Sequence, residues 1–260
     1  MRLTVVGCSG SFPGPESPAS SYLVTADDDA GRTWRVVLDL GNGALGPLQR
    51  HARLVDVDAV LVSHLHPDHF LDLCGFYVAL KYDPDGEAPG RLPVWGPPGT
   101  SARLAEAYGR PEGSGMGAQL DVRVWADGEP VRVGPFTVTP RRVLHPVEAY
   151  GVRVEAPGAD GGRRVLAYTG DTDDCPALDE LAADADLLLA EAAFHEGRDE
   201  VRGIHLTGRR AGEVATRARA RRLVLTHLPP WNDADRALAE ARQTYAGPIE
   251  LARPDAVLDV

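Results

Sequence analysis

Cysteine is scarce in this sequence, and its spacing excludes two common uses of the residue. The 260 residues contain only Cys8, Cys74 and Cys175, an odd number that is widely separated and forms no C-x-x-C pair. Neither a disulfide framework nor a zinc knuckle follows from such a pattern. We expect reduced thiols that serve packing, in a cytoplasmic protein.

Long apolar runs are also missing. No stretch approaches the ~20 consecutive apolar residues that a membrane span requires. Residues 1–7 enter a strand-like run directly, without the charged region, apolar stretch and cleavage site of a signal peptide. We therefore expect a cytoplasmic protein with no membrane partner.

Positive charge is in short supply. Lys and Arg number 27 against 38 Asp and Glu, which gives a formal net charge of −11 and a pI near 5.2. Proteins that track a long nucleic-acid backbone normally carry a basic stripe, so no long nucleic-acid partner is expected. Bound divalent metals bring positive charge of their own, so an acidic chain can still hold a small phosphate ester.

Short β-branched runs alternate with helical patterns along the whole chain. The fold class is therefore α/β or α+β. With no repeat and no long Gly/Ser linker, residues 1–260 are expected to form a single domain. The predicted strands are 4–6, 22–25, 35–40, 59–62, 136–142, 151–155, 164–168, 187–191 and 223–226. The predicted helices are 45–53, 70–80, 100–108, 177–183, 208–220 (capped by Thr207) and 233–245 (capped by Asn232). The Pro/Gly-rich stretch 84–93 is predicted to be a loop, with the character of a mobile flap.

The most informative segment follows the strand predicted at 59–62. His64, His66, Asp68 and His69 lie within six residues, on what we expect to be a tight loop before a helix that begins near residue 70. A loop can converge side chains that a regular strand would splay to alternate faces. A single histidine is more often a packed or surface residue, but imidazole and carboxylate at this density indicate a site for Zn²⁺ or a neighbouring divalent ion.

Together with this run, four further motifs make the chain resemble the metallo-β-lactamase superfamily, whose motifs occur in the same order along the sequence. They are Asp39 in 37–41, His145 in 144–146, Asp171 in 168–172 and His227 in 225–228. The resemblance implies a four-layer αββα sandwich with two divalent metal ions, most readily Zn²⁺, with Mn²⁺ or Fe²⁺ as alternatives. It also implies the ligand sets: His64, His66 and His145 for the first ion, Asp68, His69 and His227 for the second, and Asp171 bridging them. Asp39 would orient a ligand through a hydrogen bond, or else be an ordinary turn aspartate.

The C-terminal half resembles the ribonuclease Z branch of this superfamily, with Glu191 at a strand end and His205 before a helix. The departing alkoxide of a phosphodiester is a poor leaving group, and a histidine held by a glutamate can protonate it. The implied reaction has a metal-bridging hydroxide, oriented by Asp68, that attacks phosphorus while His205, steered by Glu191, protonates the leaving oxygen. Taken singly, His205 and Glu191 could equally be a helix-start and a strand-end residue without a special role.

The substrate is expected to be small. The basic arm with which bacterial ribonuclease Z grips tRNA has no counterpart in the short span between His145 and Asp171, which holds only a turn at 157–164. Segments 6–22, 125–130 and 226–231 resemble a bacterial group of cyclic-nucleotide phosphodiesterases, although turns and packing aromatics explain each of them about as well. We therefore expect hydrolysis of a cyclic nucleotide by a homodimer. A Gly/Ser turn at 9–11 is a weaker candidate for offering backbone N–H groups to the phosphate.

Other functions remain open at this stage. They are tRNA 3′ processing without the arm, sulfatase or lactonase chemistry, and a non-catalytic metal-binding or ligand-sensing module, against which the complete ligand set argues. Cys8 and Cys74 are expected to be packing residues. No role is assigned to His51 or His195, for which a surface or structural position is the default.

Overall fold

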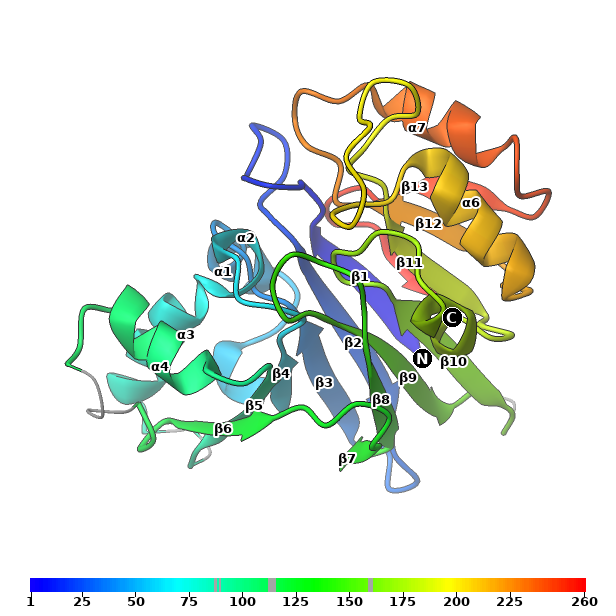
Figure 1. The fold of residues 1–260 in the computed structure, drawn as a ribbon. Coiled ribbons are helices and arrows are strands. Elements are labelled where there is room, and N and C mark those ends of the chain that lie inside the picture. Colours follow the sequence, from blue (N-terminus) through cyan, green and yellow to red (C-terminus); the bar gives the residue numbers. More distant parts are fainter. Residues whose placement is uncertain (87, 89, 112–115, 159–160) are drawn as a thin grey trace.

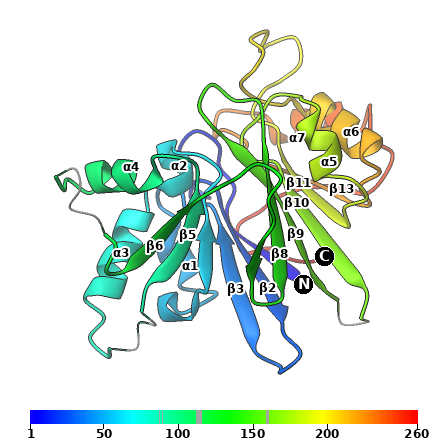
Figure 2. The same ribbon diagram turned by 60° about the horizontal axis from the view of Figure 1, so that its bottom comes forward.

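Two β-sheets face each other at the centre of the molecule, and helices cover their outer sides (Figure 1). The computed structural model describes residues 1–86, 88, 90–111, 116–158 and 161–260. Figure 2 shows α1–α4 on one outer side and α5–α7 on the other. This is the expected four-layer αββα arrangement.

The first sheet belongs mainly to the N-terminal half of the chain. Its strand order is β14-β1-β2-β3-β4-β5-β6. The strands are β1 (Arg2–Gly7), β2 (Ser21–Asp27), β3 (Thr33–Leu38), β4 (Ala59–Leu61), β5 (Leu92–Gly96), β6 (Leu120–Val124) and the C-terminal β14 (Val257–Asp259). Strands β3 to β6 run parallel to one another, so their carboxyl ends meet at one edge.

The second sheet has the order β13-β12-β11-β10-β9-β8-β7. The strands are β7 (Val131–Val133), β8 (Phe136–Arg142), β9 (Tyr150–Pro157), β10 (Arg163–Tyr168), β11 (Leu187–Glu191), β12 (Leu223–Thr226) and β13 (Ile249–Leu251). Strands β10 to β13 are parallel, whereas β7, β8, β9 and β10 pair antiparallel. This sheet therefore has a parallel half and a meander half.

Helices fill the outer layers. They are α1 (Leu45–Leu48), α2 (Pro67–Phe70), α3 (Leu73–Lys81), α4 (Thr100–Ala107), α5 (Ala177–Leu181), α6 (Gly208–Arg217) and α7 (Ala234–Ala241), with a short 3₁₀ turn at Leu54–Asp56. Thr207 caps α6 as expected, by accepting a hydrogen bond from the backbone N–H of Arg210. Asp233, and not Asn232, caps α7, because its carboxylate accepts from Asp235 and Arg236. Among the described residues, none of the helices is both long and apolar enough to cross a lipid bilayer.

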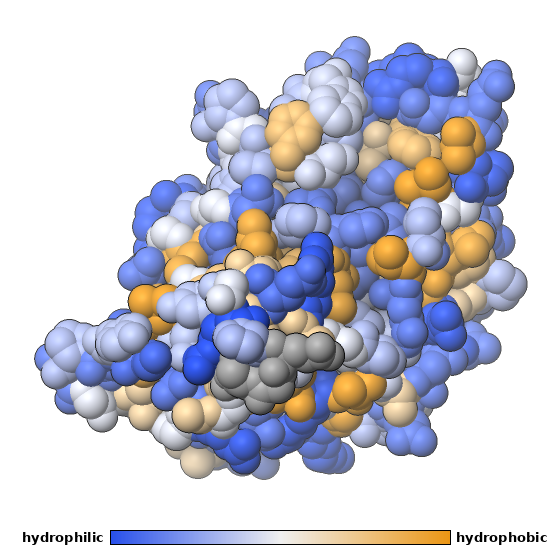
Figure 3. Space-filling view, turned by 60° about the vertical axis from the view of Figure 1, so that its left-hand side comes forward, coloured by the Kyte–Doolittle hydropathy of each residue, from blue (hydrophilic) through white to orange (hydrophobic). Residues whose placement is uncertain are grey.

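Three apolar cores hold the four layers together. One lies between the sheets and includes Tyr22, Phe136 and Tyr168. The other two lie between each sheet and its helices, with Phe70 and Phe76 under the first sheet's helices and a largely Leu/Ala/Val set under α5–α7. On the face seen in Figure 3, hydrophobic residues surface only in small patches among hydrophilic ones. Burial of both faces explains why central parallel strands such as β11 and β12 are nearly continuous apolar runs.

Several elements differ from the sequence prediction. The helix predicted at 70–80 is split into α2 and α3 and begins three residues earlier, because Pro67 supplies the fixed φ of a first helical position. Part of the predicted flap at 84–93 is strand β5, whose Pro93 lies just before the ladder with β4 begins at Val94; residues 87 and 89 of that stretch lie outside the described residues. Strands β6, β7, β13 and β14 were not predicted. They are the edge strands of the two sheets and are only partly buried, so they lack the continuous apolar runs of the central strands.

Candidate metal centre

The functional side chains expected from the sequence gather where parallel strands of both sheets end. Asp39 follows β3, His64 follows β4, Asp171 follows β10, Glu191 ends β11 and His227 follows β12. Carboxyl ends of parallel strands are the usual place for sites in open α/β sheets, because the loops there start from one edge. Each sheet contributes side chains, so the site lies between the two halves of the chain.

The segment after β4 supplies four of these side chains. His66 has the extended backbone of a helix N-cap, and Asp68 and His69 lie within the single turn of α2, not on a loop as the sequence suggested. The turn packs against the end of β3: the backbone N–H of Leu40 donates to the carbonyl of His69 over 2.7 Å. A Cβ at Gly41 would lie 2.0 Å from the carbonyl oxygen of Asp68. Only glycine permits this contact.

The first group of potential ligands consists of His64, His66, His145 and Asp171, whose ligand atoms all lie within 4.8 Å of one another. Nδ1 of His66 is 3.0 Å from Nε2 of His64 and 3.3 Å from Nε2 of His145. Oδ2 of Asp171 is 3.7 Å from Nε2 of His64. The group matches the set expected for the first ion.

The second group consists of Asp68, His69, Asp171 and His227, again with ligand atoms within 4.8 Å of one another. Oδ1 of Asp171 is 3.2 Å from Nε2 of His69, and its Oδ2 is 3.2 Å from Nε2 of His227. Oδ2 of Asp68 is 3.5 Å from Nε2 of His69. Asp171 thus belongs to both groups, the position expected of a bridging carboxylate.

The buried atoms that face one another here fit cations. Nε2 of His69, Oδ1 of Asp171 and Nε2 of His227 are buried and have no hydrogen-bond partner among the described residues. Buried polar atoms are rarely left in this state, so such a cluster needs an explanation. Lone pairs of imidazole and carboxylate that converge on one point are the donor set that divalent transition ions prefer.

In three of these histidines, the second ring nitrogen, Nδ1, contacts a polar atom of another residue. Nδ1 of His69 donates to Oδ2 of Asp39 over 2.8 Å. Nδ1 of His227 is 2.8 Å from Oγ of Ser20, and Nδ1 of His145 donates to the carbonyl of Ile204 over 2.8 Å. The carboxylate and the carbonyl can only accept, so they fix the proton on Nδ1 of His69 and His145. All three contacts leave Nε2 aimed at the centre, which is how ligands are oriented in metal sites.

Asp39 is itself held in place. Its carboxylate accepts from the backbone N–H and the hydroxyl of Ser63 and from the hydroxyl of Tyr168, each over 2.7 Å. Asp39 and His227 both have positive φ, 54° and 55°. Such backbone conformations cost free energy in residues other than glycine and persist where the surroundings enforce them, often at functional sites.

The local electrostatics favour neutral histidines in the first ligand group and a positive charge near His69 in the second. Burial lowers the pKa of His64, His66 and His145 below the usual value for histidine, so these rings keep their lone pairs. His69 behaves differently: burial opposes its charged form, yet Asp171, Asp39 and Asp68 raise its pKa well above the usual value. The three carboxylates therefore favour a positive charge next to His69, and a bound cation would supply it.

Glu191 and His205 form a third group with Asp171. Nδ1 of His205 donates to Oε1 of Glu191 over 2.8 Å, and the fully buried Glu191 also accepts from the backbone N–H groups of Thr172 and Ala193. The imidazole ring lies 5.5 Å from that of His145 and 5.6 Å from that of His227, measured between centroids. Burial opposes the charged form of His205, but Glu191 and Asp171 raise its pKa to about 9.

Two positioning interactions were not predicted. Asp173 is buried and accepts from Arg210, Arg202 and the backbone N–H of Gly203. Arg210 also donates to the carbonyl of His205 over 3.1 Å. The loop that carries His205 is therefore tied to the loop that carries Asp171. Only the D-x-D spacing of 171 and 173 hinted at this in the sequence.

The remaining expectations about single residues are largely settled by their contacts. No cysteine belongs to the three groups of metal-type side chains found in the described residues. His51 pairs with Asp255 at the surface, and His195 is buried. The Gly/Ser turn at 9–11, the weaker candidate for contacting the phosphate, is not supported at Ser9 and Gly10, because their N–H groups already donate to the carbonyls of Pro18 and Leu228.

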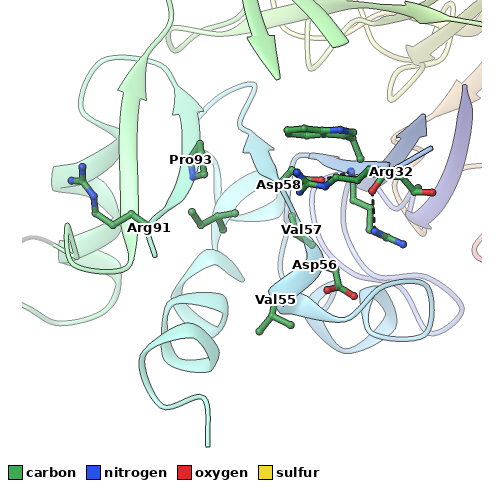
Figure 4. Close-up of a pocket in the computed structure, with 11 residues that line it drawn as sticks. Arg32, Val55, Asp56, Val57, Asp58, Arg91 and Pro93 are labelled. Carbon is green, nitrogen blue, oxygen red and sulfur yellow. Dashed lines mark hydrogen bonds and ion pairs between the residues drawn. The ribbon is translucent and has the colours of Figure 1, made fainter. Parts of the chain in front are cut away.

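A well-formed hollow elsewhere is not part of this centre. A pocket of about 530 Å³ is lined by Arg32, Trp34, Asp58, Arg91 and neighbours (Figure 4). It lies at the start of β4 and β5, the opposite ends of the strands from the metal-type side chains. Arg32 pairs with Asp58 and lies 3.9 Å from the centroid of the Trp34 ring, so these charges satisfy one another.

Comparison with known proteins agrees with the geometry. Residues 34–228 match the family model described as beta-lactamase superfamily domain. An uncharacterized protein of Mycobacterium leprae is 44% identical over 96% of this chain and 85% of its own length. A ribonuclease Z of Myxococcus xanthus is 31% identical over 97% of this chain and 95% of its own. The crystal structure of the metallo-β-lactamase fold protein YhfI from Bacillus subtilis superposes with a TM-score of 0.85 at 27% identity, covering 99% of this chain and 98% of that one. The chain belongs to the metallo-β-lactamase superfamily, as a metallo-hydrolase related to ribonuclease Z.

Proposed function

We propose that the protein is a dinuclear, metal-dependent phosphodiesterase that hydrolyses small cyclic nucleotides. The observation that carries the proposal is the hydrogen bond between Glu191 and His205 next to the ligand groups. Nδ1 of His205 lies 4.0 Å from Oδ2 of Asp171, the carboxylate that both ligand groups share. An alkoxide that departs from phosphorus is a poor leaving group, and a positioned acid assists its departure by protonating it. A held imidazole beside the metal groups supports phosphodiester chemistry.

Two bound divalent ions, for which we propose Zn²⁺, would lower the pKa of a water molecule and stabilise negative phosphoryl oxygens. The residues in named roles are His64, His66, Asp68, His69, His145, Asp171 and His227, which would hold the ions. Burial disfavours the charge of Asp68, but His69 holds its pKa well below the usual value. Asp68 is therefore a carboxylate that can accept a hydrogen bond from the attacking water and orient it.

The leaving group is served by His205. As water oxygen bonds to phosphorus, the ester P–O bond breaks and its electron pair stays on the departing oxygen. The proton on Nε2 of His205 passes to that oxygen. The proton on Nδ1 stays on the ring and is hydrogen-bonded to Glu191, whose carboxylate stabilises the positive charge of the ring before the Nε2 proton is transferred. The water's proton leaves through the carboxylate of Asp68 to solvent, so the ring of a cyclic nucleotide opens to one product, a nucleoside phosphomonoester with a free hydroxyl group.

A cyclic nucleotide suits the charge and the topology better than tRNA does. The net charge is −11, and strands β9 and β10 pair from Arg163 opposite Pro157 to Tyr168 opposite Val152, so that the chain between His145 and Asp171 is mainly one hairpin. The ribonuclease Z relative favours RNA processing as the second candidate.

The test is a substrate panel on protein loaded with a defined metal: 3′,5′- and 2′,3′-cyclic nucleotides, precursor tRNA and an aryl phosphodiester. The proposal expects a cyclic nucleotide to give the highest kcat/KM. Release of mature tRNA at a higher kcat/KM would replace it with the RNA-processing function.

A further inference from the structure

Two large aromatic side chains stand exposed beside the metal centre. Phe12 is 39% exposed and Trp231 is 64% exposed, and their ring centroids lie 4.8 Å apart with the planes tilted by 43°. Tryptophan is usually well buried in folded proteins, so exposure of this extent suggests a surface that another group covers.

Both residues belong to loops that build the second ligand group. Trp231 lies four residues after His227, and Phe12 lies two residues after Gly10, whose N–H donates to the carbonyl of Leu228 over 3.1 Å. A Cβ at Gly10 would lie 2.2 Å from the carbonyl oxygen of His227. The loop of Phe12 is thus packed against the backbone of a potential metal ligand.

The Trp231 loop is also hydrogen-bonded to segment 193–194, which contacts His205. The side chain of Asn232 donates to the carbonyl of Ala193 over 2.7 Å. The next residue, Phe194, places its ring 5.0 Å from that of His205, edge to face. The loops that carry the aromatic pair are therefore joined to the second ligand group and, through the segment of Phe194, to the acid group.

The two loops are stiff. Pro13 and Pro15 follow Phe12, and Pro229 and Pro230 precede Trp231. Proline fixes φ and limits the conformations of the chain. Gly14 lies so close to the second loop that a Cβ there would be 3.1 Å from Pro230. Rings held in this way lose little conformational entropy when a ligand covers them, which favours binding.

We propose that Phe12 and Trp231 form a stacking platform for the nucleobase of the substrate. The inference rests on the proposed function and adds to it where the base lies and which part of the nucleotide is recognised. Every base has an apolar π-face that stacks on aromatic side chains, and this contact tolerates different bases. The nearby Arg198 is engaged with Asp199 and Asn232, so the platform offers ring faces and not a second phosphate site. Purine nucleotides, with the larger ring system, should bind more tightly than pyrimidine nucleotides.

The test compares two cyclic diesters on metal-loaded protein: 3′,5′-cyclic AMP, and the 3′,5′-cyclic phosphate of methyl ribofuranoside, which lacks the base. Trp231→Ala should raise KM for cyclic AMP by about 5- to 100-fold, the equivalent of one lost base stack, and leave KM for the base-free diester unchanged. Trp231→Phe should restore most of the affinity. Tyr82→Ala is the matched control, because Tyr82 is equally exposed at 64% but follows α3. Equal KM changes on both diesters, or none on cyclic AMP, would overturn the platform.

A binding measurement separates this inference from the proposed function. If the protein hydrolyses no cyclic nucleotide, the function fails, and the platform is judged by AMP and ribose 5-phosphate binding. Stronger binding of AMP that Trp231→Ala abolishes would support the platform. Equal binding of the two ligands would overturn it. A change of oligomeric state in Trp231→Ala, seen by light scattering, would also overturn it, because the pair would then be a contact between two copies of the chain.

Discussion

Oε1 of Glu191 accepts a hydrogen bond from Nδ1 of His205 over 2.8 Å, and this contact joins the end of β11 to the loop before α6. It gives the imidazole one orientation and leaves Nε2 as its available proton donor. The two residues act as one unit in the proposed chemistry, and the first prediction concerns that unit.

Replacing His205 with Ala should lower kcat for a cyclic nucleotide by about 10²- to 10⁴-fold, the usual contribution of a general acid. An aryl diester such as bis(4-nitrophenyl) phosphate has a good leaving group and should lose far less. The measurement is kcat on both substrates. Equal losses would show that His205 does not protonate the leaving oxygen.

Replacing Asp39 with Asn should weaken metal binding by about 10- to 100-fold, because the neutral amide no longer holds Nδ1 of His69 as a carboxylate does. Metal affinity is measured by competition with a chromophoric chelator. Asp184→Asn, which alters only an exposed pair with Arg219, is the control. Unchanged affinity in Asp39→Asn would mean that His69 needs no such support.

Metal ions should stabilise the folded protein. A ligand that binds only the folded state at about 100 times its Kd adds about 2.7 kcal/mol to the free energy of unfolding. Adding Zn²⁺ to chelator-treated protein should raise Tm accordingly, and Asp171→Ala should remove most of the rise because Asp171 belongs to both ligand groups. A rise of the same size in that variant would place the stabilising ion somewhere else.

Replacing Gly41 with Ala should destabilise the protein by about 1–3 kcal/mol, the usual range for overpacking. The added methyl group would meet the carbonyl of Asp68 and push α2 away from β3, so metal affinity should fall as well. Gly46→Ala is the matched control, because nothing lies within 4 Å of a Cβ there. Chemical denaturation measures both variants, and equal stability would show that the turn relaxes without cost.

The local part of the site could be predicted from the sequence, because His64, His66, Asp68 and His69 are neighbours in the chain and form an unusual cluster. His145, Asp171 and His227 were assigned only through family resemblance, since single histidines and aspartates give no signal of their own. The oxygen of Ser20 that faces His227, and those of Ser63 and Tyr168 that hold Asp39, could not be predicted. Serine is common, and such contacts depend on how distant segments pack.

The same limit applies to the fold. The apolar strands β11 and β12, which are buried on both faces, were predicted with their bounds correct. Strands β7, β13 and β14 have three residues each and no periodicity to detect. They pair because β8, β12 and β1 present an edge to them, which is tertiary information.

Each ligand group takes side chains from both halves of the chain: in the second group, His69 comes from α2, beside the first sheet, and His227 follows β12 of the second sheet. Coordination by both would join segments far apart in the sequence as long as the protein is folded. Unfolding would separate these segments and release the ions, so the free energy of metal binding adds to the stability of the fold. The ions would then contribute to the association of the two sheets as well as to the chemistry, and a chelator would weaken both.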